Sequence, residues 1–371
     1  MDFFVEKQDL LKELTFVRSA VEKRATIPIL SHFLLEADGF ELKISATDLE
    51  IAARTACPTK GKTKGSAIVP GLRFLDIIRS APDGEIRCRA LENNWVNVTY
   101  QRSSFKLVGL PKEDFPKLPR LPGSVAKIDA ALLADCVEKT AFAMSSEESR
   151  YVLNGALLKL HPEGVTMVAT DGHRLAVVEQ THASPGLKEE VSVLVPRKAL
   201  FALGRLANEG VGGAAVEISK NKSHLFFAVG SRLLATRLLD GQFPDYKSVL
   251  PKENGKVIEL DREAFEGSIR RVALLADGQM HGICLTLGNG RLEVSASSAD
   301  YGEAKEVIET VYDQDGLQIG FNADYVLDFL GAVRSANAIR VELKDAESAA
   351  EFRAIGDASD GYRYVLMPLR L

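Results

Sequence analysis

Residues 65–86 read GSAIVPGLRFLDIIRSAPDGEI, and this stretch decides the fold because two variants of it recur along the chain. Residues 191–210 read VSVLVPRKALFALGRLANEG, and residues 317–341 read LQIGFNADYVLDFLGAVRSANAIRV. Each begins as a short apolar strand that ends at Pro or Asn, where a helix is expected to start. Successive copies are 126 residues apart. This spacing predicts three tandem copies of one fold.

Other landmarks repeat in step with these stretches. An amphipathic helix pattern precedes a pair of strand patterns in each copy, and an FP pair recurs at Phe115 and Phe243. We therefore predict an α+β protein of three domains, each with two helices and antiparallel sheets, at residues 1–122, 127–251 and 256–371. The predicted helices are 7–24, 71–80, 130–150, 197–208, 261–276 and 322–336.

Composition narrows the class of protein. The chain has 371 residues, a formal net charge of -5 and 46% hydrophobic residues, as expected for a globular protein of several domains. No apolar run approaches the roughly 20 residues of a membrane span, and the N-terminus carries acids where a secretion signal carries bases. The four cysteines form no CxxC pair. A cytoplasmic protein with reduced, buried thiols and no membrane association is therefore expected.

The stretch TDGHRLAVVE, residues 170–179, is the strongest candidate for chemistry. Asp171 and His173 could form the acid/base pair of a hydrolase, with Arg174 holding an anion. However, Thr47 and Asp48 occupy the matching place in the first repeat with no His-Arg after them. An acid that recurs without its partner fits turn capping better than catalysis. We therefore predict a structural turn at Asp171 and a surface or groove role for His173 and Arg174.

Other catalytic motifs are missing. GKTKGS at 61–66 lacks the earlier glycine of a phosphate-binding loop and follows Pro58, so it is interpreted as a solvated basic loop. The chain has no HExxH, GxSxG or GxGxxG motif. We expect no catalytic residue, no metal site and no cofactor.

Several strings in the order of the chain carry a family resemblance: RATIPILSHFLLE, ATDLE, RYVLNG, ATDGHRLAV, VPRKAL, DGQFPDYKSVLP, GFNADYVLDFL and YVLMPLRL. Together with the threefold repeat, they resemble the beta subunit of bacterial DNA polymerase III, the sliding clamp, over the whole chain. The resemblance implies a DNA-clamp fold that closes as a head-to-tail dimeric ring around duplex DNA. The ring would tether the replicative polymerase for processive synthesis without doing chemistry. The alternative is a repeat-built scaffold or a hydrolase that uses Asp171 and His173 without DNA.

The resemblance also implies a groove that receives short linear peptides, of a type with a Gln-Leu pair and a Phe. Its partners would be the polymerase III alpha subunit, the clamp-loader delta subunit, other polymerases and repair proteins. Ser248 stands where some relatives have Arg, so one charged contact is absent. The matching groove residues are Leu153, Thr170, Gly172, His173, Arg174, Leu175, Pro244, Val249, Asn322, Tyr325, Val365, Met367, Pro368, Leu369 and Arg370.

DNA contacts are expected from cations along the predicted helices and the nearby loops. These helices carry a small excess of basic residues while the rest of the chain is acidic. A weakly basic channel suits sliding, because phosphate contacts through Lys and Arg carry no sequence information. The candidates are Arg24, Arg73, Arg79, Arg150, Tyr151, Arg197, Lys198 and Arg205.

The dimer interface implied by the resemblance is a small apolar contact ringed by ion pairs. Leu274 and Leu275 are adjacent, so we expect only one of them to face outward. Gly302 and Lys305 interrupt the acidic segment, and Lys305 is expected to weaken the ionic part of the closure. The apolar residues are Phe105, Leu107, Leu274 and Leu275, and the charged ones are Arg73 and Arg102 facing Asp300, Glu303 and Glu306.

Overall fold

A computed structural model describes residues 1–22, 26–147, 149–181, 187, 189–208, 214–278, 280–356 and 361–370. The chain divides into two compact units, each with its own sheets. We call them unit 1, within residues 1–134 and 198–238, and unit 2, within 135–183, 188–197 and 239–371. Unit 1 therefore combines the first predicted repeat with part of the second. No helix among the described residues is long and apolar enough to span a membrane.

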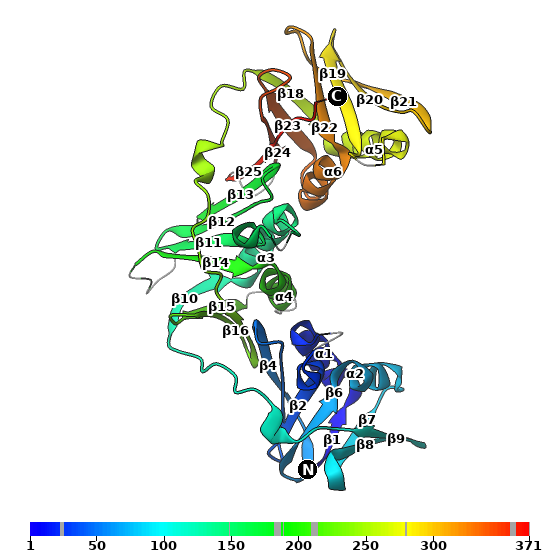
Figure 1. Cartoon of the computed structure of the whole chain (residues 1–371), viewed down its shortest axis with the longest axis vertical. Coiled ribbons are helices and arrows are strands. Elements are labelled where there is room, and N and C mark those ends of the chain that lie inside the picture. The colour runs from blue at the N-terminus through cyan, green and yellow to red at the C-terminus, as the bar shows by residue number, and fades with distance from the viewer. Residues whose placement is uncertain are drawn as a thin grey trace. The chain divides into compact units, whose positions relative to one another are not determined.

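All six predicted helices are present, and the prediction of two per repeat is confirmed (Figure 1). Single 3-10 turns extend three of them, at Arg18–Ala20, Ala141–Ala143 and Ala273–Leu275. The helices are α1 Lys7–Val17, α2 Gly71–Ser80, α3 Ala130–Thr140, α4 Arg197–Asn208, α5 Arg262–Val272 and α6 Ala323–Ala332.

The predicted ends of the first, third and last helices were wrong. The backbone is extended at Val21 and Met144, so the first helical segment stops before 24 and the third before 150. In α3 the Thr140 hydroxyl donates to the Cys136 carbonyl, a side-chain bond that competes with helix continuation. The last helix stops at Ala332 and not at 336. Its start was predicted correctly, since the Asn322 side chain accepts from the Tyr325 N–H.

Unit 1 contains two antiparallel sheets. In the first, of order β5-β1-β7-β8-β9, strand β9 is an edge. Its strands are β1 Asp2–Glu6, β5 Lys60–Thr63, β7 Glu85–Ala90, β8 Trp95–Tyr100 and β9 Ser103–Val108. The second has the order β10-β15-β16-β17-β4-β3-β2-β6. Its strands are β2 His32–Ala37, β3 Glu41–Thr47, β4 Ile51–Pro58, β6 Gly65–Pro70, β10 Ser124–Asp129, β15 Ala215–Lys220, β16 His224–Val229 and β17 Arg232–Arg237.

Unit 2 repeats this plan. Its larger sheet has the order β14-β11-β12-β13-β25-β24-β23-β18, and its smaller sheet runs β21-β20-β19-β22. The larger sheet is built from β11 Gly155–His161, β12 Gly164–Thr170, β13 Arg174–Thr181, β14 Val191–Pro196, β18 Lys256–Asp261, β23 Ala338–Leu343, β24 Ala350–Ile355 and β25 Tyr362–Leu366. The smaller is built from β19 Gly282–Gly288, β20 Arg291–Ser298, β21 Gly302–Glu309 and β22 Leu317–Asn322.

Both large sheets continue across the borders between repeats. Strand β4 of the first repeat pairs with β17 of the second, and β13 of the second pairs with β25 of the third. In unit 1 a buried ion pair adds to this joint, because Arg232 holds the Glu13 carboxylate of α1 through two nitrogens, at 2.9 and 3.0 Å. Neighbouring repeats therefore share hydrogen-bonded sheets.

Two smaller predictions have different outcomes. The segment 61–66 is not a loop, because it forms part of edge strand β5 and the start of β6, although its lysines stay exposed. The four cysteines are free and buried, as predicted. Burial raises the pKa of the Cys57, Cys88 and Cys136 thiols to about 12, which keeps them protonated at neutral pH.

Candidate functional site

The floor of the candidate site is an apolar cluster in unit 2, which we call the groove cluster. Three predicted groove residues belong to it: Leu175 and Val365 are buried within it, and half-buried Leu153 packs against it. Sequence reasoning missed Phe243 and Tyr246, although the recurring FP pair marks this segment. The buried members are Leu157, Val168, Leu175, Val177, Leu194, Phe243, Tyr246 and Val365.

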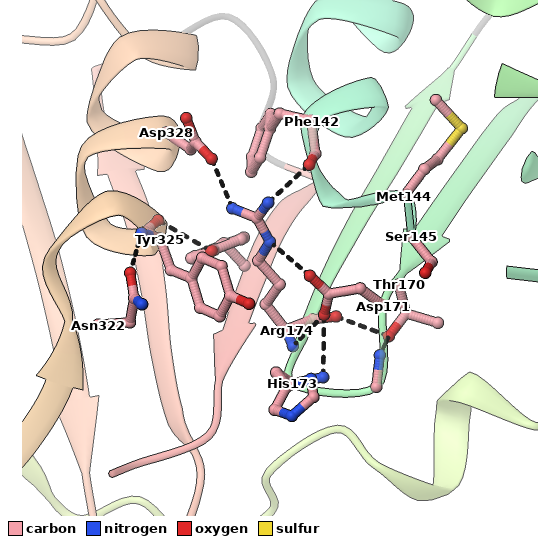
Figure 2. A network of polar contacts seen from close by, with 12 residues as sticks. Phe142, Met144, Ser145, Thr170, Asp171, His173, Arg174, Asn322, Tyr325 and Asp328 are labelled. Atoms are coloured by element: carbon pink, nitrogen blue, oxygen red, sulfur yellow. Dashed lines mark hydrogen bonds and ion pairs between the residues drawn. The ribbon is translucent and has the colours of Figure 1, made fainter. Parts of the chain in front are cut away.

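A tight turn at residues 170–174 forms one wall of the site (Figure 2). The Asp171 carboxylate accepts the backbone N–H groups of His173 and Arg174 through Oδ1, at 2.9 and 3.1 Å. The Thr170 hydroxyl donates to the Arg174 carbonyl and accepts from the Gly172 N–H. Gly172 has φ +90°, a conformation that favours glycine. The predicted turn role of Asp171 is confirmed.

The first repeat builds the same turn from different residues. Asp48 Oδ1 accepts the N–H groups of Glu50 and Ile51, and the Thr47 hydroxyl donates to the Ile51 carbonyl. Leu49 takes the place of Gly172 and has φ +76°. The acid therefore serves the fold in both repeats.

Arg174 lies at the centre of a polar network (Figure 2). Its guanidinium donates to Asp171 Oδ2 at 3.0 Å, to Asp328 Oδ2 on α6 at 2.7 Å and to the Phe142 carbonyl at 2.7 Å. It also stacks 4.1 Å from the centre of the Tyr325 ring. Burial alone would lower the pKa of Arg174, but the Tyr364 hydroxyl and the carboxylates of Asp328 and Asp171 raise it on balance. These bonds stay within the chain and Arg174 is buried, so it shapes the site from within and does not lie on the surface.

The C-terminal segment 367–370, which we call the tail, follows β25 and lies beside this turn. The Met367 N–H donates to the His173 carbonyl at 2.9 Å, and the Leu369 N–H donates to the Gly320 carbonyl at 2.8 Å. Met367 is 44% exposed and Val249 is 49% exposed. Both line a cavity of about 480 Å³ that also contains Pro251 and Ala349. Apolar surface is therefore accessible beside the turn.

Other predicted groove residues have local structural partners. Asn322 caps α6, and its amide donates to the Met280 carbonyl at 2.9 Å. The Ser248 hydroxyl donates to the Asp245 carbonyl, so it closes a local turn. His173 and Pro244 are exposed, and Pro368 and Leu369 are half-buried. Arg370 is exposed.

The predicted DNA-contacting residues differ in exposure and in whether another residue of the chain pairs with them. Arg73 and Arg205 are exposed, while Arg79 pairs with Asp76 at 3.4 Å. Lys198 forms an ion pair with Asp48, whose other oxygen caps the turn described above. Arg24 lies outside the described residues.

The remaining candidates have hydrogen-bond partners within unit 2, and Arg150 contacts the 170–174 turn. Arg150 donates to the Asp171 carbonyl at 2.6 Å, and the Tyr151 hydroxyl accepts from the Asp240 N–H. Arg197 donates to the Met144 carbonyl at 3.4 Å. Arg150 therefore sits in a loop after α3, where the sequence had predicted helix.

Most of the predicted interface residues lie on or beside two edge strands and in one turn, whereas Arg73 lies on α2. Phe105 and Leu107 are half-buried on β9, and Arg102 is exposed just before it. Leu274 is 78% exposed and Leu275 is half-buried, as expected for adjacent residues.

One member of the predicted charged set, Glu306, is engaged within the chain. Glu306 binds Arg271 through both oxygens, at 2.6 and 2.7 Å, and Lys305 pairs with Glu293 at 2.6 Å. Asp300 and Glu303 are exposed.

The described residues hold no group of three or more His, Cys, Asp or Glu placed to bind a metal ion. Both Asp171 oxygens are occupied by the turn and by Arg174. Asp171 therefore serves the turn and a cation, as Asp48 does in the first repeat.

Comparison with known proteins gives consistent matches over the full length. Residues 1–119, 127–245 and 247–370 match the family models of the N-terminal, central and C-terminal domains of the DNA polymerase III beta subunit. Beta sliding clamps of Pseudomonas putida and Escherichia coli (strain K12) are each 35% identical, with 100% of both chains covered. A crystal structure of a sliding clamp from Pseudomonas aeruginosa bound to griselimycin has a TM-score of 0.92, 35% identity and 100% coverage of each chain.

Proposed function

Because this chain belongs to the DNA polymerase III beta subunit family, the non-catalytic sliding clamps of DNA replication, we propose that its groove docks partner proteins through short linear peptides. The groove consists of the groove cluster, the 170–174 turn, Val249 and the tail. The observation that carries the proposal is exposed Met367 beside a buried apolar floor. Apolar walls with a flexible Met and few polar groups suit peptides of varied sequence.

The partners that we propose are the polymerase III alpha subunit, the clamp-loader delta subunit, other polymerases and repair proteins. All would use the same groove, so they would compete for it. We place the work of the clamp in the bacterial cytoplasm, where the chromosome is replicated. The proposed domain limits are 1–122, 127–251 and 256–371.

We also propose that two copies close head to tail around duplex DNA. Strands β9 and β21 are free edges of their sheets, and exposed Leu274 lies next to β21 in the fold. Free strand edges pair readily with another chain. Arg73 and Arg205 would approach phosphates, whereas Glu147 and the Asp171 carbonyl hold Arg150, and Asp48 holds Lys198.

Griselimycin tests the groove, because it is bound by the related clamp from Pseudomonas aeruginosa. Titration with fluorescent griselimycin should show saturable binding to the wild-type protein. Met367→Ala should weaken it by about 1–3 kcal/mol, the range of a strong groove contact. The control Phe40→Ala changes an exposed side chain of unit 1 and should leave the affinity unchanged. Equal affinity in the wild type and Met367→Ala would contradict the proposed groove.

A further inference from the structure

A second cavity lies along the tail, next to the edge of strand β22. It measures about 550 Å³ and is lined by Gln318, Ile319 and Gly320 of β22, by Ala346 and Glu347, and by the tail. Met367 and Glu347 line both this cavity and the one at Val249. A chain that leaves the groove at Met367 therefore has a continuous surface to follow.

The backbone of β22 is open along this cavity. The sheet ends at β22, and the tail covers the edge by a single bridge between Leu369 and Gly320. Since the Gly320 carbonyl points to the tail, strand alternation directs the N–H and C=O of Gln318 to the same side. Gln318 is exposed and lines the cavity. A main-chain donor and acceptor are therefore presented to an incoming strand.

We propose that a partner peptide bound in the groove continues across the tail and adds to β22 as an extended strand. This inference rests on the proposed function of the groove and adds a recognition mode to it. The Gln318 N–H and C=O would pair with the peptide backbone, which favours extended segments of any sequence. The bridge between Leu369 and Gly320 sets the register in which the added strand would pair with β22.

Two charged residues of the cavity, Glu347 and Arg370, favour particular charges in the added peptide segment. Glu347 and Arg370 both line the cavity, are exposed and make no ion pair with another described residue. A basic residue near Glu347 and an acidic residue near Arg370 would complement them. The occupant is therefore a mixed-charge extension of the docking peptide.

The test compares a short peptide of the Gln-Leu and Phe type with versions extended at either end by an alternating charged segment. One extended version should bind the wild-type clamp about tenfold more tightly than the short peptide, as expected for two net main-chain hydrogen bonds. Gln318→Pro removes the N–H donor at an edge position where Pro is tolerated, so this gain should vanish. The control Gln318→Ala keeps the N–H and should keep the gain. Glu347→Lys should reverse the preference for a basic over an acidic residue in the segment.

The short peptide should bind wild type, Gln318→Ala and Gln318→Pro equally, which shows that the groove is intact. The proposal of an added strand would be overturned if Gln318→Pro showed the same gain in affinity as the wild type. It would also be overturned if neither extended peptide bound the wild type more tightly than the short peptide. A change in sedimentation of the peptide-free Gln318→Pro protein would assign the edge to a second copy of the chain. If the short peptide does not bind the wild type, the proposed groove is contradicted, and with it the added strand that depends on it.

Discussion

At the scale of single residues, one carboxylate serves both the backbone and a cation in two repeats. Asp171 caps its turn with Oδ1 and holds Arg174 with Oδ2, and Asp48 caps the matching turn and holds Lys198. The cation comes from the same turn in one repeat and from α4 in the other. The acid is part of the repeat, whereas its partner is not.

Arg174→Ala should destabilise the protein more than any change at the exposed wall of the groove. It leaves Asp171 and Asp328 without their cation, and breaking a largely buried pair such as Arg174–Asp171 costs about 3–5 kcal/mol, while half-exposed Asp328 adds less. Urea unfolding followed by circular dichroism measures the loss. The matched control is Arg370→Ala, which removes an exposed arginine and should change unfolding by less than about 0.5 kcal/mol. Similar values for the two variants would show that the network contributes little.

These residues also show how far the sequence could predict the site. The turn at Asp171 was predictable because Asp48 repeats it, and local capping leaves a local pattern. The role of Arg174 was not, because its partners Phe142 and Asp328 are distant in the chain and only folding brings them together. A buried network of this kind leaves no spacing rule to recognise.

At the scale of elements, strand β21 and helix α5 neutralise each other's charges. The sequence predicted that Glu306 faces a second chain, and the structure shows it bound to Arg271. This ion pair and its hydrogen bonds hold the pKa of Glu306 below its ordinary value of 4.5. Ring closure would therefore depend more on strand pairing and Leu274 than on these charges.

The stability from Glu306 should depend on pH. Its pKa is lower in the folded than in the unfolded protein, so its contribution is complete above 4.5 and is lost as the pH falls through the depressed value. Glu306→Gln should therefore lower the urea midpoint at neutral pH, and this difference should shrink progressively as the pH is lowered below 4.5. The reference is Glu303→Gln, an exposed acid on the same strand. A Glu306→Gln difference that persists undiminished in acid would refute the ion-pair explanation.

The exposed leucine of the turn after α5 gives a second prediction at this scale. Leu274→Ala should shift the protein towards monomer. The Leu274 side chain is 78% exposed in the single chain, so it offers a large apolar contact to a second copy. Sedimentation at low concentration measures the shift. The neighbouring Leu275 is half-buried, so Leu275→Ala should not change dimerisation but should lower the free energy of unfolding. A dimer unaffected by Leu274→Ala would place the interface elsewhere.

At the scale of the whole molecule, the repeat was visible in sequence and the sheet continuity was not. The spacing of 126 residues predicted three copies and six helices, which the fold contains. The pairing of β4 with β17 and of β13 with β25 joins segments far apart in the chain. Strand order depends on such distant contacts, and apolar alternation does not encode it.

The last prediction concerns the ring as a tether. A clamp that encircles DNA should stay on a closed circular plasmid during gel filtration, once it has been loaded by a clamp loader, and should leave when a restriction enzyme linearises the circle. Retention depends on topology, whereas affinity for phosphates depends on charge and salt. Arg205→Ala should flatten the salt dependence of direct DNA binding by about one slope unit, as expected for one lost phosphate contact, and leave retention on circles intact. Lys198→Ala is the matched control, since Asp48 already holds that cation and the slope should change less. Retention on linear DNA equal to that on circles would mean that the protein binds the duplex without encircling it.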